Sequence, residues 1–253
     1  VICTLAAMIA LSYRGRRGHD KVQIENGRNA LERIVGGATE GLQADPNGAT
    51  IAFEMIAPTL AAEAEKLGLI KNQGDRILGR LSKQRAKKLA FLQKNMINRH
   101  VTMAFSAEMA GTDERHMLDV ENLQESNGSV GVSPSATAYF ATYIKKGDEA
   151  SLNYLRKAMK SDGGMPNVAP FDVFETAWSL WNLGMIPDLE VTEKLKPHID
   201  FLSSTWQPQR GVGYAASCSV RDSDDSVITY SALLRFGIQK DLASVLAYEE
   251  EDH

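Results

Sequence analysis

The chain has 253 residues, of which 43% are hydrophobic and 24% charged, a balance typical of globular proteins. The formal net charge of −4 gives no basic footprint, so we expect no nucleic-acid partner. Two cysteines occur, Cys3 and Cys218, which excludes a disulfide framework and indicates a reducing compartment. We therefore expect a cytoplasmic protein.

The longest apolar run, Val1 to Leu11, is too short to span a bilayer. No basic segment precedes it, as one would in a signal peptide. We interpret the run as a core helix and expect no membrane span. Because the chain begins without Met, we also expect it to start inside a larger protein.

Helical periodicity dominates the whole chain. The first half predicts helices over Val1–Ser12, Lys21–Val35, Ala49–Leu67 (bent or restarted at Pro58), Asp75–Lys94, Met96–Ala110 and Glu114–Leu123. The second half predicts helices over Ser133–Ile144, Glu149–Ser161, Phe171–Gly184, Glu190–Ser203, Asp224–Gly237 and Lys240–Tyr248. No strand period persists for more than a few residues, so we predict an all-α fold with short loops.

Two turn-rich segments hint at an internal repeat. Gln124 to Ser129 and Trp206 to Tyr214 each contain glycine and a polar or aromatic anchor, and each leads toward a helix. Repeated helical pairs of this kind favour a curved or closed α–α arrangement.

A cluster of carboxylates stands at the start of the penultimate predicted helix, at Asp222, Asp224 and Asp225. One interpretation is helix capping, since Asp accepts orphan backbone N–H groups and favours the helix dipole. The other is an acid site. Three carboxylates this close cannot all ionise cheaply, so one proton is retained at a raised pKa and can be donated.

Four segments in order decide how these residues are interpreted. The stretches 51–68, 124–139, 163–175 and 222–225 resemble, respectively, the GFE–P–A–LG, QxxDGSW, GGVPNV-P-D-FE and DxDD segments of class II diterpene cyclases. The set covers nearly the whole chain in the family's order. The chain therefore resembles the copalyl diphosphate synthases of this family, and in texture their fungal members more than their plant members.

The resemblance implies a fold of α–α barrel-type terpene cyclase helices. Residues 1 to about 200 would form the inserted γ domain, and residues 201–253 would begin the β domain that carries DxDD. The rest of β would lie outside the chain, as would any fused class I α domain. We accordingly expect the isolated 253-residue chain to be inactive.

The resemblance also implies a reaction. Family members protonate the terminal alkene of geranylgeranyl diphosphate and close two rings to a copalyl diphosphate isomer, with the diphosphate retained. It assigns the acid role to Asp224, with Asp222 and Asp225 orienting and polarising it. No aspartate-rich DDxxD motif is present, so metal-driven ionisation of the diphosphate is not encoded in this sequence.

Four further residues gain candidate roles by resemblance. Asn167 matches an Asn that holds a water for the final deprotonation, although it could instead cap the helix at Phe171. Phe105 stands where plant members have the partner His, and its ring could stabilise a cation or simply pack in the core. Lys87 and Lys88 fall near a diphosphate-contacting Lys of the family, but they also suit a solvated helix face.

The family further implies Mg²⁺. Plant members carry an acidic stretch near the start of the γ domain, whereas the matching loop here holds only Asp45. One carboxylate is too few for a Mg²⁺ site, so the sequence does not identify the metal ligands.

Two alternatives to this function stay open. One is a class II cyclase of another prenyl substrate, farnesyl diphosphate or squalene. Triterpene cyclases, however, repeat Q-and-W motifs and carry a membrane-facing apolar helix, and we find neither in the sequence. The other is a non-catalytic helical module that only binds or assembles.

Overall fold

The computed structural model describes residues 1–36, 53–71 and 74–249. Within these ranges the regular secondary structure is helical, and extended pairing is limited to isolated bridges such as Gln207 with Gly211. This confirms the predicted all-α class. Nowhere in the described ranges does a helix combine the length and the apolar character needed to cross a membrane.

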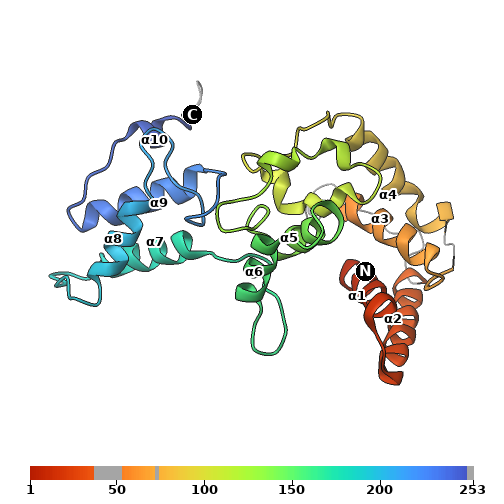
Figure 1. The fold of residues 1–253 in the computed structure, drawn as a ribbon. Helices are drawn as coiled ribbons and strands as arrows, with labels where there is room; N and C mark the ends of the chain where they lie inside the picture. Colours follow the sequence, from red (N-terminus) through yellow and green to blue (C-terminus); the bar gives the residue numbers. More distant parts are fainter. Residues whose placement is uncertain (37–52, 72–73, 250–253) are drawn as a thin grey trace. The chain divides into compact units, whose positions relative to one another are not determined.

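The helices follow one another along the chain in the order shown in Figure 1. The α-helices are α1 (Ile2–Arg14), α2 (Gly18–Gly36), α3 (Phe53–Lys66), α4 (Gly74–Leu89), α5 (Pro134–Tyr139), α6 (Glu149–Ala158), α7 (Asp172–Leu183), α8 (Lys196–Thr205), α9 (Ser223–Arg235) and α10 (Ala243–Leu246). The 3-10 segments are η1 (Thr102–Ala110), η2 (Arg115–Met117) and η3 (Val120–Asn122), and a π-helical turn, η4 (Phe140–Ile144), continues α5.

The chain divides into two compact units. The first unit contains residues 1–96 and 108–118, and the second contains residues 97–107 and 119–253. This division reports packing within each unit and does not address which parts correspond to γ and β domains. The boundary near residue 200 therefore stays a prediction.

The first unit is built around α1, which packs against α2 and α3. The apolar face of α1 supplies Leu5, Met8 and Ile9 to a core that Leu31, Ala61 and Ala64 complete. The spacing of the three α1 residues places them on one side of a helix, in agreement with the prediction of a core helix for this run.

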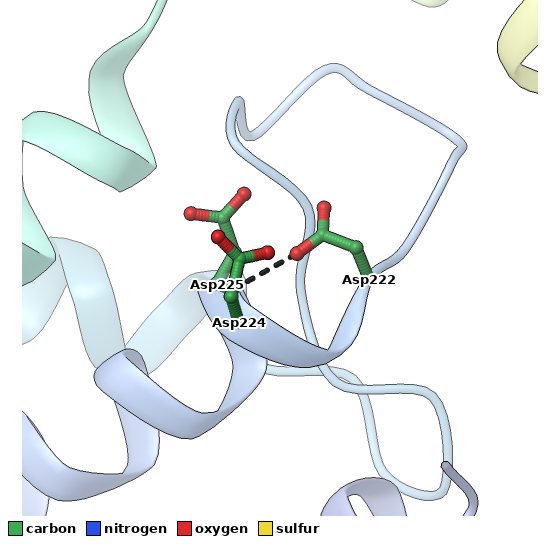
Figure 2. Close-up of side chains that lie close together, drawn as sticks. All are labelled: Asp222, Asp224 and Asp225. Carbon is green, nitrogen blue, oxygen red and sulfur yellow. Dashed lines mark hydrogen bonds between the residues drawn. The ribbon is translucent and has the colours of Figure 1, made fainter. Parts of the chain in front are cut away.

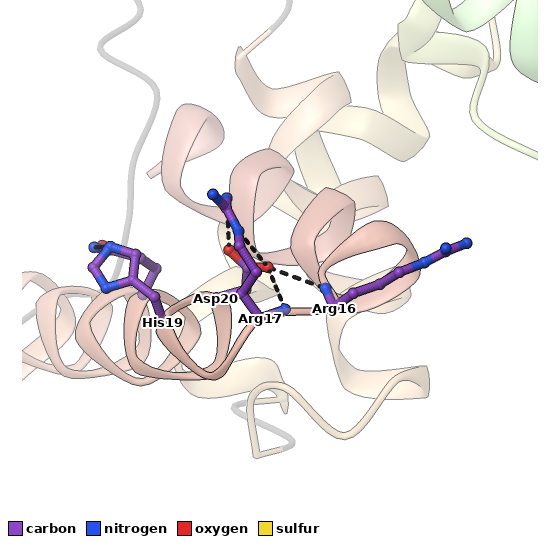
Figure 3. A network of polar contacts seen from close by, with 5 residues as sticks. Arg16, Arg17, His19 and Asp20 are labelled. Atoms are coloured by element: carbon purple, nitrogen blue, oxygen red, sulfur yellow. Dashed lines mark hydrogen bonds and ion pairs between the residues drawn. The ribbon is translucent and has the colours of Figure 1, made fainter.

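The carboxylate of Asp20 stabilises the turn between α1 and α2 (Figure 3). The buried Asp20 side chain accepts hydrogen bonds from the backbone N–H groups of Arg16 at 3.0 Å and Arg17 at 2.9 Å. The Arg17 guanidinium adds an ion pair at 3.1 Å. The Asp20 carboxylate thus satisfies the two backbone donors that immediately precede α2 and fixes the turn between α1 and α2.

Helix α3 runs through Pro58 as one helix, so the predicted restart there is not seen. Pro58 lies in the second turn, where its ring removes the backbone donor to the carbonyl of Glu54. The next residue compensates locally, because the Thr59 hydroxyl donates to the carbonyl of Met55 at 3.0 Å.

The second unit packs α7 directly against α9 and places α8 against both (Figure 1). The core at this junction consists of Val173, Ala177, Leu180, Ile199, Leu202, Trp206, Val212, Ala232 and Leu233. This packing holds the first turn of α9, which carries the three aspartates, on a rigid base.

Two predicted helices are shorter than expected. The prediction of a helix over Met96–Ala110 is wrong before residue 102. Ile97 and Arg99 pair their backbone groups with Asp119 and Asn122, which are distant in sequence, at 2.8 and 2.9 Å. Helix α8 starts at Lys196 instead of Glu190, and it carries a proline in its first turn, where the missing backbone N–H breaks no hydrogen bond within the helix.

Candidate acid site

The three aspartates come together at the N-terminus of α9 (Figure 2). Asp222 is the N-cap residue, and its carboxylate accepts the backbone N–H of Asp225 at 2.9 Å. One carboxylate oxygen from each of Asp222, Asp224 and Asp225 lies within 4.8 Å of the others. Capping and clustering therefore occur in the same three residues, and the two interpretations of the sequence are compatible.

The three carboxylates differ in their exposure. Asp225 is buried, with 4% of its surface exposed, and its Oδ1 has no hydrogen-bond partner. Asp222 is half-buried and Asp224 is exposed. A buried carboxylate oxygen without a partner is unfavourable when ionised, so this arrangement favours a protonated carboxyl.

Burial, together with the adjacent Asp222 and Asp224 carboxylates, raises the pKa of Asp225 to about 7. Burial also raises the pKa of Asp222 to about 6, although the hydrogen bond from the Asp225 backbone opposes this effect. Because the two groups interact, the proton belongs to the cluster as a whole. The cluster therefore retains a proton close to neutral pH and can act as a general acid.

A buried hydroxyl one turn into α9 holds the cap in place. The Ser226 Oγ donates to the carbonyl of Asp222 at 2.6 Å and accepts the backbone N–H of Val212 at 3.1 Å. The backbone N–H of Asp222 in turn donates to the carbonyl of Val212 at 3.2 Å. Gly211, at φ +70°, makes room, since a Cβ there would lie 2.2 Å from the Ser226 Oγ.

The loop between Val212 and Asp222 is anchored to the Gln124–Gly131 segment. The Tyr214 hydroxyl donates to the carbonyl of Gly131 at 3.1 Å. Ser219 donates through its N–H at 2.9 Å and its hydroxyl at 2.6 Å to the buried carboxylate of Glu125. Sequence reasoning missed Glu125 and Ser219, because no local pattern marks a contact between residues so far apart in the chain.

Phe105 connects to the same loop through its backbone. It lies half-buried in η1, and Gly131 packs against it so closely that a Cβ at Gly131 would lie 2.6 Å from the Phe105 nitrogen. Gly131 is also the residue that Tyr214 contacts. Gly131 therefore links Phe105 to Tyr214, which lies in the loop that leads into α9. The predicted contact of the Phe105 ring with a cation stays a prediction.

Asn167 lies exposed in the loop before α7. The N-cap of α7 is Phe171, and no side chain caps the helix there. The capping role is therefore not seen for Asn167. Its role in the final deprotonation stays a prediction.

Lys87 and Lys88 belong to the first unit, at the end of α4. The Lys88 ammonium pairs with the buried carboxylate of Glu54 on α3, and both Lys87 and Lys88 are exposed. This pair neutralises a buried charge and ties α4 to α3. The predicted contact of either lysine with a diphosphate is not tested by it.

The described residues do not fit a resident Mg²⁺ beside a working acid. Asp45, the candidate ligand, lies outside the described residues. In the described ranges the one group able to offer three carboxylate ligands is the aspartate cluster itself. A hard cation bound there would keep all three carboxylates ionised and displace the proton that the acid requires.

No protein-family model matches the chain. Sequence comparison finds 43% identity over 257 residues to the "Type B diterpene cyclase" of Mycobacterium tuberculosis, covering 100% of this chain and 51% of the relative. Identity to "Ent-copalyl diphosphate synthase 1, chloroplastic" of Oryza sativa subsp. japonica is 30% over 241 residues, covering 94% and 26%. The chain thus spans about half the length of the first relative and about a quarter of the second. Since these relatives come from a bacterium and a plant, the fungal texture stays a prediction.

The fold is similar to that of a solved structure of the same group. The crystal structure of ent-copalyl diphosphate synthase from Arabidopsis thaliana, in complex with (S)-15-aza-14,15-dihydrogeranylgeranyl thiolodiphosphate, superposes with a TM-score of 0.77 at 26% identity. The match covers 98% of this chain and 35% of that protein. With the relatives in sequence and the ordered motifs, this shows that the chain belongs to the class II diterpene cyclase family.

Proposed function

We propose that the native, full-length protein is a class II cyclase that converts geranylgeranyl diphosphate to a copalyl diphosphate isomer. The observation that carries this proposal is the buried, unpartnered carboxyl oxygen of Asp225 within a cluster that holds a proton near pH 7. Protonation of an alkene requires a neutral acid, and a carboxylate cluster that retains a proton near pH 7 contains one. The names of the relatives support the same chemistry.

In the proposed reaction Asp224 is the proton donor. It is the exposed member of the cluster, so its carboxyl can reach a substrate, and the proton that the three carboxylates share leaves through it, with the negative charge left behind on the cluster. The O–H bond breaks, the proton adds to the terminal alkene, and the resulting tertiary cation closes two rings. Loss of a carbon-bound proton, for which Asn167 with a water is the proposed acceptor, completes the isomerisation. The C–O bond to the diphosphate stays intact.

Three further parts of the proposal concern the surroundings of the reaction. Mg²⁺ would shield the charge of the diphosphate, but no step is assigned to it because the described residues do not form its site. Lys87 and Phe105 are the proposed contacts of the diphosphate and of the cation, and Lys88 would have to leave Glu54 to join them. The two cysteines, neither of them in a disulfide, suit the cytoplasm, where we place the protein.

Product analysis tests the proposal. The full-length protein is incubated with geranylgeranyl diphosphate, the products are dephosphorylated, and the alcohols are identified together with their stereochemistry. We expect a bicyclic copalyl alcohol, and we expect Asp224→Asn to abolish it with an unchanged circular dichroism spectrum. Unchanged turnover by Asp224→Asn would overturn the assignment of the acid. Turnover of farnesyl diphosphate or squalene instead would overturn the substrate, and no turnover of any of the three would favour a non-catalytic module.

A further inference from the structure

Helices α5 and α9 begin with the same arrangement of backbone hydrogen bonds. The N–H of the N-cap residue Ser133 donates to the carbonyl of Val130 at 3.0 Å, and the N–H of the N-cap residue Asp222 donates to the carbonyl of Val212 at 3.2 Å. Each cap side chain then accepts the N–H three residues later, at 3.3 Å for Ser133 and 2.9 Å for Asp222. The internal repeat that the sequence hinted at is therefore present at the level of hydrogen bonds.

The match extends to a buried hydroxyl four residues after each cap. The Thr137 Oγ1 donates to the carbonyl of Ser133 at 2.6 Å and accepts the N–H of Val130 at 2.9 Å. Ser226 makes the same two contacts with Asp222 and Val212, at 2.6 and 3.1 Å. Both hydroxyl-bearing side chains are fully buried. When the two helix starts are aligned in this way, Ser135 takes the position equivalent to Asp224, and Ala136 takes the position equivalent to Asp225.

The two copies differ in how the chain reaches the cap. In the first, Gly131 and Val132 are the only residues between Val130 and Ser133, so a tight turn holds the cap close to Val130. In the second, residues 213–221 intervene between Val212 and Asp222. The longer connection restrains Asp222 less than the tight turn restrains Ser133, so the Ser226 hydroxyl carries more of the task of holding the cap beside Val212.

We propose that Ser226 is a positioning residue of the acid site, whose hydroxyl fixes the backbone of Asp222 so that its carboxylate stays beside Asp225. The inference rests on the proposed function for its effect on turnover, but not for its effect on the carboxylates themselves. Ser226 is fully buried and its hydroxyl bonds the backbone of Asp222 and Val212, so it would act through Asp222 and not on the substrate itself.

The positioning has an electrostatic consequence. The negative charge of Asp222 is one of the causes that raise the pKa of Asp225. If Asp222 drifts away, its repulsion weakens and the pKa of Asp225 falls, although burial continues to raise it. Other groups act on the same surroundings. Tyr248 lies in the C-terminal segment. Burial and the Asp222 carboxylate raise its pKa, whereas Arg221 and Arg210 lower it. Arg210 and Arg221 are unchanged in a Ser226 variant, whereas Tyr248 loses the hydrogen bond that it shares with the Ser226 side chain.

The chain offers a matched control for this proposal. Ser226→Ala removes one hydroxyl from the copy with carboxylates, and Thr137→Val removes one hydroxyl from the copy without them. Both variants lose the corresponding pair of hydrogen bonds, and Ser226→Ala also loses the contact of Ser226 with Tyr248. A merely structural role predicts the same behaviour for both, namely a lower melting temperature. Ser226→Thr restores a hydroxyl that Thr137 shows to be compatible with this arrangement.

Two readouts separate the proposal from a structural role and from the proposed function. The first is titration of the aspartate carboxyl carbons by NMR in this 253-residue chain, which requires no substrate. We expect Ser226→Ala to move the highest carboxyl midpoint to lower pH by about one unit, and we expect Thr137→Val to leave it unchanged. The second is turnover of geranylgeranyl diphosphate by the full-length protein, where Ser226→Ala should lower kcat about 10- to 100-fold with little change in KM.

Rescue completes the test. Ser226→Thr should return both the midpoint and kcat toward the parent values, and Ser226→Cys, which preserves the shape, replaces the alanine variant if that variant does not fold. Equal carboxyl midpoints in Ser226→Ala and the parent would overturn the proposal, as would a shift of the same size in Thr137→Val. If the parent does not convert geranylgeranyl diphosphate, the proposed function fails, and the NMR titration still decides the role of Ser226.

Discussion

Two aspartates of the second unit do the same structural job with opposite electrostatics. Asp148 caps α6 and Asp222 caps α9, and each accepts a backbone N–H three residues later at 2.9 Å. Hydrogen bonds hold the pKa of Asp148 below its ordinary value, whereas burial and neighbouring carboxylates raise the pKa of Asp222 to about 6. Cap geometry alone therefore does not decide whether a carboxyl is ionised.

The difference comes from what surrounds the two carboxylates. Burial by itself would raise the pKa of Asp148, but the Lys145 ammonium at 2.8 Å and the Gln124 amide at 2.8 Å outweigh it. Asp222 has other carboxylates as its neighbours. A capping carboxylate stabilises the fold when its remaining lone pairs accept hydrogen bonds from other donors. It becomes part of an acid site when other carboxyl groups lie beside it. The second unit thus uses the same capping arrangement at more than one helix, and the neighbouring side chains decide whether the capping carboxyl is ionised.

The largest difference between the two sites should appear in catalysis. Asp225→Asn removes the buried acid partner of Asp222, and we expect it to lower the turnover of geranylgeranyl diphosphate by the full-length protein about 10³-fold. The counterpart Asp148→Asn should keep kcat within about twofold of the parent at a temperature where both are folded, since it contacts no part of the acid site. Single-turnover kinetics on folded samples measure both, and comparable losses in the two variants would remove the distinction.

The second test compares the caps as structural elements. Asp148→Ala removes a buried acceptor with several donors, and we expect it to lower the free energy of unfolding at pH 7 by about 2 kcal/mol. Asp222→Ala also loses a cap, but it relieves repulsion from Asp224 and Asp225, so a change below about 1 kcal/mol is expected. Urea unfolding followed by tryptophan fluorescence reports on the correct unit, because Trp178, Trp181 and Trp206 all lie in it. Equal losses at the two caps would contradict the comparison.

Much of the fold was predictable, because helical periodicity follows directly from burial of one face. Helix α6 starts at Glu149 and helix α9 starts at Ser223, both within one residue of the prediction. The segment from Met96 to Val101 was not predictable, since its apolar residues suit a helix and only distant partners turn it into an irregular link with turns. Local patterns carry no information about such partners.

The three aspartates of the candidate site were predictable from the sequence, whereas the residues that hold them in place were not. Asp222, Asp224 and Asp225 are adjacent in sequence, so any helix start brings them together. The clamp at Ser226 and the anchor at Glu125 depend on loops that meet only after folding. The sequence assigned the acid role to the middle residue, Asp224, and could not show that Asp225 is the buried one.

The third test is the pH dependence of stability, for which the two sites have opposite signs. Asp222 and Asp225 have folded pKa values of about 6 and about 7, above the ordinary 3.8, so the folded state binds more protons than the unfolded state between these limits. Their contribution therefore decreases as pH rises from 5 to 8, by about 1.5 kcal/mol after allowance for solvent screening. Asp148, with its lowered pKa, stabilises the fold above pH 4 and loses this contribution only in more acidic solution.

Urea unfolding of the parent and of Asp225→Asn at several pH values isolates the contribution of the cluster. The parent minus variant difference removes the shared titration of histidines and of other carboxylates. We expect the difference to favour the parent at pH 5 and to shrink toward pH 8. A difference that is flat over this range, or that grows with pH, would show that the cluster does not retain its proton.

The smallest effect concerns the donors around Asp148. The Gln124 amide donates to the Asp148 carboxylate at 2.8 Å, to the Ser151 hydroxyl at 2.9 Å and to the carbonyl of Gly128 at 3.1 Å. Gln124→Leu keeps much of the volume and removes these donors, so we expect a loss of about 1 kcal/mol at pH 7. Because one donor to Asp148 is gone, the acid unfolding transition should also begin at higher pH than in the parent. If donors separate the two caps, the carboxyl midpoints of the Asp222 cluster must stay unchanged in the same NMR titration, and a shift there would mean that the two sites are coupled through the Gln124–Gly131 segment.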